Sequence, residues 1–206
     1  MIEHFLPQFL PQFLAGMAVN FEIAALALVI GLTLGLVLAW ARVAGRAPGA
    51  LAAAIIGLMR AAPTFVVMFF LLNAVPRDAN LFGLLLAPSG LMAVALSLVP
   101  YSAAYIADAG VAAVMQWRAG SSHGALLFLP NVTRAFFVLV MSSGAGAAIG
   151  VNEGIAVILR QAEQFPALGD RLALFALGVA MFGIPLQIGF ALIRALQRRL
   201  GRAMMR

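Results

Sequence analysis

The sequence contains no cysteine and no lysine, and charged residues make up only 10% of its 206 residues. The absence of cysteine excludes a disulfide framework and thiol chemistry. A soluble domain carries about 25% charged residues, so the scarcity of charge excludes a water-soluble core with an ordinary surface. Hydrophobic residues account for 64% of the chain, and the mean hydropathy is +1.06. We therefore expect an integral membrane protein.

The apolar runs are about 20 residues long and show no strict alternation, which favours membrane-spanning helices over barrel strands. The fold class predicted from them is an all-α membrane protein that forms a single transmembrane domain over residues 1–206. Residues 1–13, which contain Pro7 and Pro11, are predicted to form an irregular interfacial lead-in. Five transmembrane helices are expected over residues 21–40, 51–72, 90–114, 132–151 and 172–193.

All 13 basic residues are arginines, and the formal net charge is +6. Their distribution is typical of membrane topology and gives no evidence for nucleic acid as a partner. One set of loops holds nine of them: Arg42, Arg46, Arg118, Arg134 and the five in the basic tail, residues 194–206. The positive-inside rule then predicts a periplasmic N-terminus, with the C-terminus and residues 116–130 in the cytoplasm. The chain is expected in a bacterial inner membrane, among membrane lipids.

Arg60 is the charged residue of an otherwise apolar segment, and Pro63 follows three residues later. An arginine at a helix centre costs about 2.5–3.5 kcal/mol on insertion scales, so it needs a partner, a cavity or a bundle interior. Pro63 interrupts the backbone hydrogen bonds there. Two interpretations stay open: Arg60 caps the helix break or reaches the interface, or it lines a translocation path.

Asp108 lies near the end of the third expected span. Either it pairs with Arg118 or Arg134, or it contacts a substrate directly. A second polar group lies at the end of the fourth span, where small residues allow close helix approach at Gly144, Gly146 and Gly150. Polar groups at this depth are tolerated where they line a cavity, so the predicted substrate path comprises Arg60, Pro63, Asp108, Ser142, Ser143, Asn152 and Glu153.

The sequence shows no catalytic constellation. Its two histidines, His4 and His123, are far apart in the chain. Metal-ligand spacing, glycine-rich phosphate loops and paired-carboxylate motifs are also missing. We expect no cofactor and no metal site. An intramembrane enzyme is the least favoured reading, and any ATP chemistry would come from a partner.

Several segments, in order, resemble the membrane subunits of binding-protein-dependent ABC importers for polar amino acids. Arg60-Ala-Ala-Pro63 is similar to the family's Arg-Gly-Thr-Pro, and Ala104-Tyr-Ile-Ala-Asp108 is similar to its Ala-Tyr-Ile-Ala-Glu. Leu129-Pro130 matches the Leu-Pro that closes its coupling motif, and residues 143–153 resemble its Thr-Ser…Glu segment. At residue 20, asparagine replaces the usual threonine.

The resemblance implies a type I ABC importer transmembrane fold and no enzymatic activity of this chain's own. It implies pairing with a second permease subunit, as a homodimer or a heterodimer. It also implies a cytoplasmic ABC ATPase dimer that supplies ATP hydrolysis, and a periplasmic amino-acid-binding protein that delivers the substrate.

The loop over residues 116–130 would be the ATPase-coupling element, but it is shorter than the family's loop and lacks its glutamate. The comparable residues are Trp117, Arg118, Ala119, Gly120, Leu129 and Pro130. A short amphipathic helix is expected over residues 121–128, with Ser121 as its N-cap. This helix either inserts into an ATPase groove or lies on the membrane. The alternative function is a binding or regulatory subunit that keeps the permease fold without ATP coupling.

Overall fold

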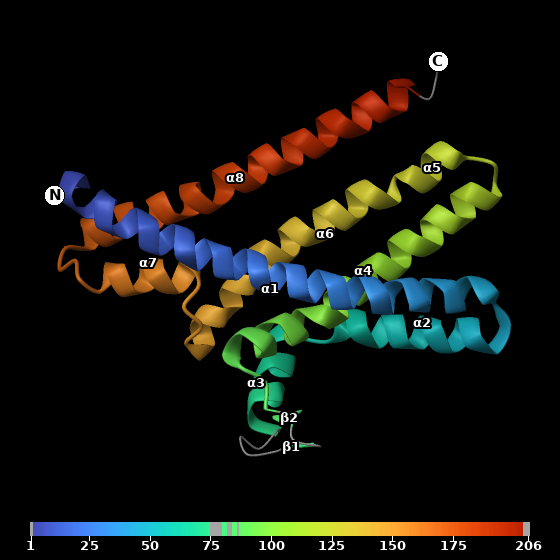
Figure 1. The fold of residues 1–206 in the computed structure, drawn as a ribbon, viewed down its shortest axis with the longest axis horizontal. Helices are drawn as coiled ribbons and strands as arrows, with labels where there is room; N and C mark the ends of the chain where they lie inside the picture. The colour runs from blue at the N-terminus through green and yellow to red at the C-terminus, as the bar shows by residue number, and fades with distance from the viewer. Residues whose placement is uncertain (1, 75–79, 82–83, 86, 204–206) are drawn as a thin grey trace.

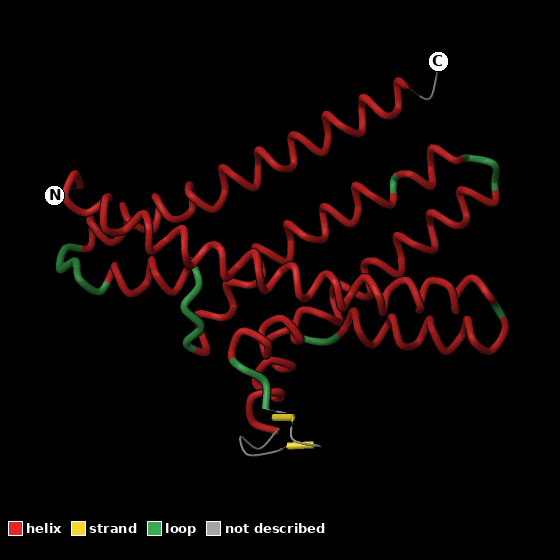
Figure 2. The backbone as a smooth tube through the Cα atoms, in the orientation of Figure 1, coloured by secondary structure: helices red, strands yellow, loops and turns green. Residues whose placement is uncertain are grey.

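The computed structural model describes residues 2–74, 80–81, 84–85 and 87–203, and nearly all of them are helical (Figure 2). This confirms the all-α fold class. A two-residue antiparallel ladder joins β1 and β2. The elements are α1 (Ile2–Ala44), α2 (Arg46–Ala61), α3 (Thr64–Ala74), β1 (Asn80–Leu81), β2 (Leu84–Leu85), α4 (Gly90–Arg118), α5 (Ser122–Leu126), α6 (Phe128–Ser142), the 3-10 helix η1 (Ser143–Ile149), α7 (Gly154–Ala162) and α8 (Leu168–Ala203).

The N-terminal segment departs from its prediction, because α1 already includes Pro7 and Pro11. The Phe-Leu-Pro-Gln repeat has a period of four, which sets its phenylalanines one helical turn apart. Phe9 and Phe13 are fully buried, and their stacked ring centroids are 5.6 Å apart. Both rings belong to a buried apolar cluster with side chains of α7 and α8. This packing offsets the hydrogen bonds that the exposed prolines remove. The irregular backbone expected over residues 1–13 is therefore wrong, and the interfacial position of this segment stays a prediction.

Helices α1 and α4 form the centre of the bundle (Figure 1). A buried apolar cluster draws side chains from both of them and from α3, α6 and α8. Gly31 and Gly35 lie on consecutive turns of α1 against α4. A Cβ atom at Gly35 would stand 2.7 Å from the carbonyl oxygen of Ala103. Small residues at this spacing let two helix backbones approach closely, as is common inside membranes.

The second expected span, residues 51–72, is not one continuous helix. It comprises α2 and α3, which are bent by 91° at a short break. Helix α3 leaves the line of α2 and projects sideways (Figure 1). The fourth span, residues 132–151, changes from α6 to the tighter η1 at Ser143. The first, third and fifth expected spans lie within α1, α4 and α8, which extend beyond them.

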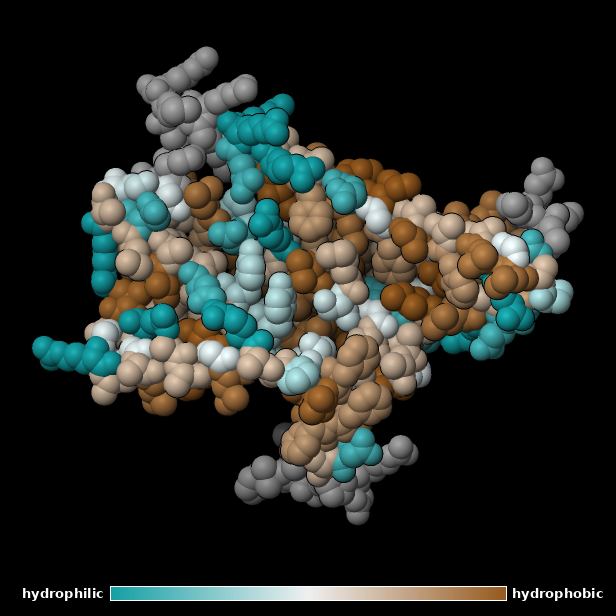
Figure 3. Space-filling model, turned by 180° about the vertical axis from the view of Figure 1, so that it is seen from behind, coloured by the Kyte–Doolittle hydropathy of each residue, from teal (hydrophilic) through white to brown (hydrophobic). Residues whose placement is uncertain are grey.

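Four helices of the described chain are long and apolar enough to cross a membrane, and the bent α2–α3 pair makes a fifth if it counts as one span. Their outer faces carry large apolar side chains, such as Leu58 and Val179, each 74% exposed. Figure 3 shows apolar side chains over much of one face, interrupted by hydrophilic patches. Length, composition and apolar exterior together indicate a multi-pass membrane protein.

Several connections lie toward the two ends of the long axis (Figure 1). The α1–α2 turn, the α4–α5 connection and the end of α8 lie toward one end, and the N-terminus and the α7–α8 connection lie toward the other. The first group carries Arg42, Arg46, Arg118 and, on α8, Arg194, Arg198, Arg199 and Arg202. We call it the basic end. The side of the membrane that it faces stays a prediction.

Candidate functional site

The first candidate region is the break between α2 and α3. A residue that precedes proline is disfavoured in the helical region, and Ala62 is accordingly extended, with a ψ of 117°. The carbonyl of Pro63 then accepts a hydrogen bond from the Val67 N–H at 3.1 Å, at the start of α3. Arg60 lies in the last turn of α2, where the helix dipole favours a cation.

Arg60 forms an ion pair with Asp108 of α4. Ile56 packs against α4 one turn earlier, and this contact holds α2 close enough for the guanidinium to reach the carboxylate. The prediction that Asp108 pairs with Arg118 or Arg134 is therefore wrong. Arg118 lies about 15 Å further along the same helix, and Arg134 lines a cavity against α8.

The ion pair is half open, with 61% of the Arg60 side chain and 51% of the Asp108 side chain exposed. Tyr101 and Tyr105 lie on the same face of α4, and their ring centroids are 6.1 Å apart. The face therefore presents a guanidinium, a carboxylate and two aromatic rings. A free α-amino acid carries the complementary pair of charges, so this arrangement can bind one by exchanging the internal ion pair for two external ones.

The second candidate region is a fully buried polar network between α1, η1 and α7. The Asn20 amide nitrogen donates to the Ser143 hydroxyl and to the Glu153 carboxylate, both at 2.8 Å. Its amide oxygen accepts from the Gly154 N–H at 2.9 Å. The Ser143 hydroxyl donates in turn to the Val140 carbonyl at 2.8 Å. Asn20, Ser143 and Glu153 are each 0% exposed, so the network fastens α1 to the end of α6 and the start of α7.

Glu153 is also the N-cap of α7. Its carboxylate accepts hydrogen bonds from the Ile155 N–H at 2.9 Å and the Ala156 N–H at 2.8 Å. Along the chain, Glu153 follows η1 and lies in the connection between two candidate membrane spans, Gly124–Ile149 and Leu168–Arg199. The carboxylate thus accepts three hydrogen bonds, and two of them come from first-turn N–H groups of α7 that have no acceptor within the helix.

The residues predicted to form one substrate path thus divide into two groups. Arg60, Pro63 and Asp108 meet at the half-open face, whereas Ser143 and Glu153 lie inside the bundle. Ser142 is half-buried beside the second group. Asn152 precedes Glu153 in the chain but is exposed, and its side-chain oxygen accepts from Arg160 at 2.9 Å.

Sequence reasoning missed Asn20 as the centre of the buried network. The available signal was an amide within an apolar run, at a position where a threonine was expected. A threonine side chain carries one hydroxyl, whereas the Asn20 amide makes three hydrogen bonds to groups more than 120 residues away. The glycines predicted to allow close helix approach have different roles. Gly146 lies against α4, whereas Gly150 adopts a φ of 81° and is the C-cap of η1.

The third candidate region is the connection over residues 116–130. Helix α4 ends in a hydrogen-bonded cap, in which Gly120 N–H donates to the Trp117 carbonyl and Ser121 N–H donates to the Gln116 carbonyl, both at 2.9 Å. Gly120 has a φ of 83°, the left-handed conformation that this type of cap requires. The Ala119-Gly120 pair therefore ends a helix.

The expected short helix is present as α5. The Ser121 hydroxyl accepts from the Gly124 N–H at 3.1 Å, which confirms this residue as the N-cap. Gly124 lies against the Gln116 side chain, where a Cβ would come within 2.8 Å. The connection over residues 116–130 is therefore an ordered helical hairpin at the basic end. We call this connection the cap.

This cap exposes several large apolar side chains. Trp117 is 68% exposed and Leu129 is 59% exposed. Arg118, Ala119 and Gly120 are exposed as well, while Pro130 in the first turn of α6 is half-buried. The surface combines an aromatic ring, apolar side chains and an arginine, which suits either a protein groove or a membrane interface.

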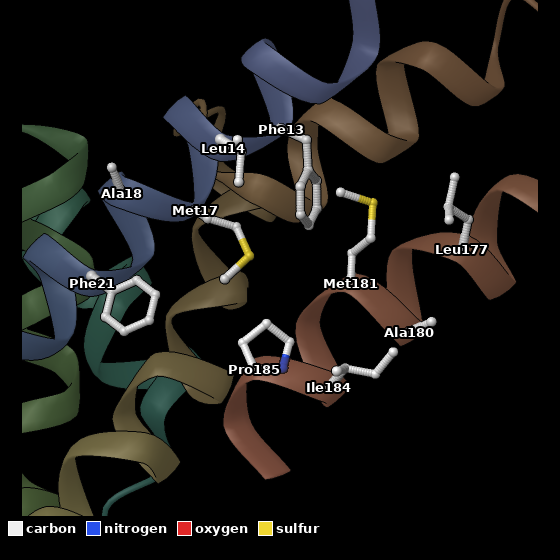
Figure 4. Close-up of a pocket in the computed structure, with 10 residues that line it drawn as sticks. All are labelled: Phe13, Leu14, Met17, Ala18, Phe21, Leu177, Ala180, Met181, Ile184 and Pro185. Carbon is white, nitrogen blue, oxygen red and sulfur yellow. The ribbon is translucent and has the colours of Figure 1, made fainter. Parts of the chain in front are cut away.

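An apolar hollow lies elsewhere, between α1 and α8. It encloses about 660 Å³, and Figure 4 shows Phe13, Met17 and Phe21 of α1 facing Met181 and Pro185 of α8. All ten side chains that line it are apolar. It offers no polar side chain to orient a polar ligand, so the half-open Arg60–Asp108 face is the better candidate for a polar substrate.

Comparison with known proteins finds no family model that matches the sequence, and no curated protein matches it. Among solved structures, the crystal structure of an amino acid ABC transporter with histidines matches with a TM-score of 0.70. The match covers 94% of this chain and 96% of that chain at 19% sequence identity. The chain therefore has the fold of a chain from an amino acid ABC transporter.

Proposed function

We propose that the protein is a transmembrane permease subunit of an ABC transporter that imports a polar amino acid across a bacterial inner membrane. The observation that carries this proposal is the fold likeness over 94% of the chain. In this proposal the chain pairs with a second permease subunit. A cytoplasmic ABC ATPase dimer drives transport, and a periplasmic binding protein delivers the amino acid.

The substrate path of this proposal follows the α2–α3 break. Arg60 and Asp108 hold the α-carboxylate and the α-amino group of the amino acid, and Tyr101 and Tyr105 form an adjacent wall. The half-open geometry of the ion pair supports this assignment, because both charges are already paired and yet accessible. Pro63 interrupts the helix at the bend, and the buried network around Glu153 holds the neighbouring helices in place.

The ATPase-coupling surface of this proposal is the cap over residues 116–130. The arginine bias of the basic end supports a cytoplasmic location. The exposure of Trp117 and Leu129 beside a rigid helix end supports docking into a groove. Trp117, Arg118, Ala119, Gly120, Leu129 and Pro130 form the contact in this proposal.

The test is reconstitution. The chain is co-expressed with candidate ATPase and permease subunits from neighbouring genes, and uptake of labelled amino acids into proteoliposomes is measured with and without ATP. We expect a purifiable complex and ATP-dependent uptake. A chain that purifies alone and retains no ATPase would contradict the proposal.

A pair of tryptophan variants tests the coupling surface within that complex. Trp117→Ala is expected to lower amino-acid-stimulated ATP hydrolysis several-fold, since exposed aromatic anchors often dominate protein interfaces. Trp40→Ala is the matched control, because Trp40 is 76% exposed on α1, shortly before the α1–α2 turn, and lies outside the cap. Equal effects of the two substitutions would argue against a specific role for the cap.

The second candidate function is a binding or regulatory subunit that keeps this fold without ATP coupling. The shortness of the cap and its lack of a glutamate favour it. Grafting a full-length coupling loop in place of residues 116–130 separates the two functions. A gain of ATP-dependent uptake argues against the regulatory subunit, and unchanged substrate binding without uptake supports it.

A further inference from the structure

A small polar cavity lies between α6 and α8, next to the cap over residues 116–130, whose last residue, Pro130, helps to line it. Asn131 and Arg134 reach it from α6, and Arg194 and Gln197 reach it from α8. The cavity has a volume of about 40 Å³. The residue spacings of three on both helices place each pair on one helix face. The cavity is therefore built by two helix faces that meet.

Aromatic packing fixes the two helices beside this cavity. The ring centroids of Phe137 on α6 and Phe190 on α8 are 5.1 Å apart. Phe190 and Ile193 form the apolar wall of the cavity. On the outer side of α8, Ile188 and Leu192 are 56% and 65% exposed. A polar cavity thus adjoins an apolar helix surface that faces lipid.

The cavity carries uncompensated positive charge. The sequence has no acidic residue from Ala109 to Asn152, or from Arg171 to the end of the chain. Within the part of the chain that the structure describes, Arg60 and Asp108 form the one ion pair. Two guanidinium groups at one small cavity repel each other unless an anion lies between them.

The donor set points to a phosphate group. Guanidinium groups bind phosphate through two parallel hydrogen bonds, and neutral amides add further donors without adding charge. A water molecule requires about 10–15 Å³ of such space, so the cavity exceeds what one water fills. Basic pockets between membrane-spanning helices are a known setting for anionic lipid headgroups. A soluble phosphate has no apolar part that could pack against Phe190 and Ile193, whereas a phospholipid has acyl chains.

We propose that Arg134, Arg194, Asn131 and Gln197 bind the phosphate of an anionic phospholipid whose acyl chains lie along Phe190 and Ile193. Such a lipid neutralises the two arginines and joins α8 to α6 at a point where few other polar contacts do so. The proposal requires only that the chain spans a membrane, and it stands apart from the transport function.

The experiment measures thermal unfolding of the full chain in detergent, followed by tryptophan fluorescence. Micelles containing phosphatidylglycerol are titrated in, with phosphatidylcholine micelles and sodium phosphate as separate arms. We expect saturable stabilisation by phosphatidylglycerol and none by phosphatidylcholine. Arg134→Gln combined with Arg194→Gln is expected to weaken the apparent lipid affinity about thirty-fold, since each arginine near a membrane surface contributes about one factor of five.

The matched control is Arg198→Gln combined with Arg199→Gln, which removes two exposed charges from the same helix outside the cavity. We expect its affinity to stay within about three-fold of the native value. Equal losses in the two double variants would mean a diffuse basic surface and would overturn the site. Stabilisation by sodium phosphate without a preference for phosphatidylglycerol would overturn the lipid assignment.

If the glutamine variant does not fold, Arg134→Lys combined with Arg194→Lys replaces it. Lysine keeps the charge but not the planar fork of donors, so the affinity is expected to fall about ten-fold. Native affinity in this variant would overturn the phosphate geometry proposed here.

Discussion

Two polar clusters in this chain contain a carboxylate, and they are built in opposite ways. Glu153 is 0% exposed and accepts three hydrogen bonds, from Asn20 and from two N–H groups of α7. Asp108 has one side-chain partner, Arg60, and about half of its side chain is exposed. The sequence presents both residues in the same way, as an acid within apolar sequence.

The difference shows how burial and the number of partners divide structural from functional polar groups. A carboxylate whose acceptor capacity is used by the protein has little left for a ligand, whereas a half-open ion pair can exchange partners. The buried cluster therefore reads as a fastening between helices. We propose the open cluster as the place where a charged ligand binds.

The largest expected effect is the loss of the buried carboxylate. Glu153→Ala leaves two N–H groups of α7 and the Asn20 amide without their acceptor. We expect a loss of about 3 kcal/mol in the free energy of unfolding, seen as a lower thermal midpoint in detergent and a smaller monodisperse fraction. Glu153→Gln keeps one acceptor oxygen and is expected to lose about half as much.

Glu163 supplies the control for this experiment, because it lies at the opposite end of α7 and is exposed. A carboxylate near a helix C-terminus is slightly unfavourable, so Glu163→Ala should be neutral or mildly stabilising. If Glu153→Ala were as mild, the network would not be the fastening described here.

The second prediction concerns the open cluster. Arg60→Ala or Asp108→Ala is expected to lower uptake by the reconstituted complex about ten-fold, since a hydrogen bond to a charged group is worth about 1.5–3 kcal/mol. Each variant should lose only about 1 kcal/mol or less in stability, as is usual for accessible ion pairs. Uptake and thermal midpoint are measured on the same preparations, with Arg42→Ala as the control.

The stability measurement also reports what the open face contacts. If it faced lipid, each single variant would leave an uncompensated charge there, at a cost of about 2.5–3.5 kcal/mol. Folded yield would then fall together with uptake. In that case the double variant that exchanges the two charges, Arg60→Asp with Asp108→Arg, should restore folding. If folding were restored without uptake, the ion pair would still be assigned to substrate binding.

Much of the helical framework could be predicted from sequence, because long apolar runs have few alternatives in a membrane. The Ser121 cap and the interruption at Pro63 could be predicted too, since both follow from local backbone chemistry. The bend between α2 and α3 could not, because proline marks a break without setting its angle. The helical start of α1 was mispredicted from its prolines, since the burial of Phe9 and Phe13 outweighs them.

The candidate site was harder to predict because its contacts are not local. Asp108 lies closer in sequence to Arg118 than to Arg60, yet it pairs with Arg60 across two helices. The partners of Asn20 lie 123 and 133 residues away. Without coordinates, nothing distinguishes a polar residue that fastens two helices from one that lines a path.

The smallest expected effect concerns Asn152, which is adjacent to Glu153 but shares none of its hydrogen bonds to Asn20 or to α7. Its one side-chain hydrogen bond in the described chain is the exposed one from Arg160 at 2.9 Å. Asn152→Ala should change the free energy of unfolding by no more than about 0.5 kcal/mol, and a double-mutant cycle with Arg160→Ala should give a coupling energy of similar size. If Asn152 belongs to the substrate path, uptake falls about three-fold while the thermal midpoint stays constant. A loss of stability as large as that of Glu153→Ala would instead assign Asn152 to the buried fastening and remove the boundary between the two clusters.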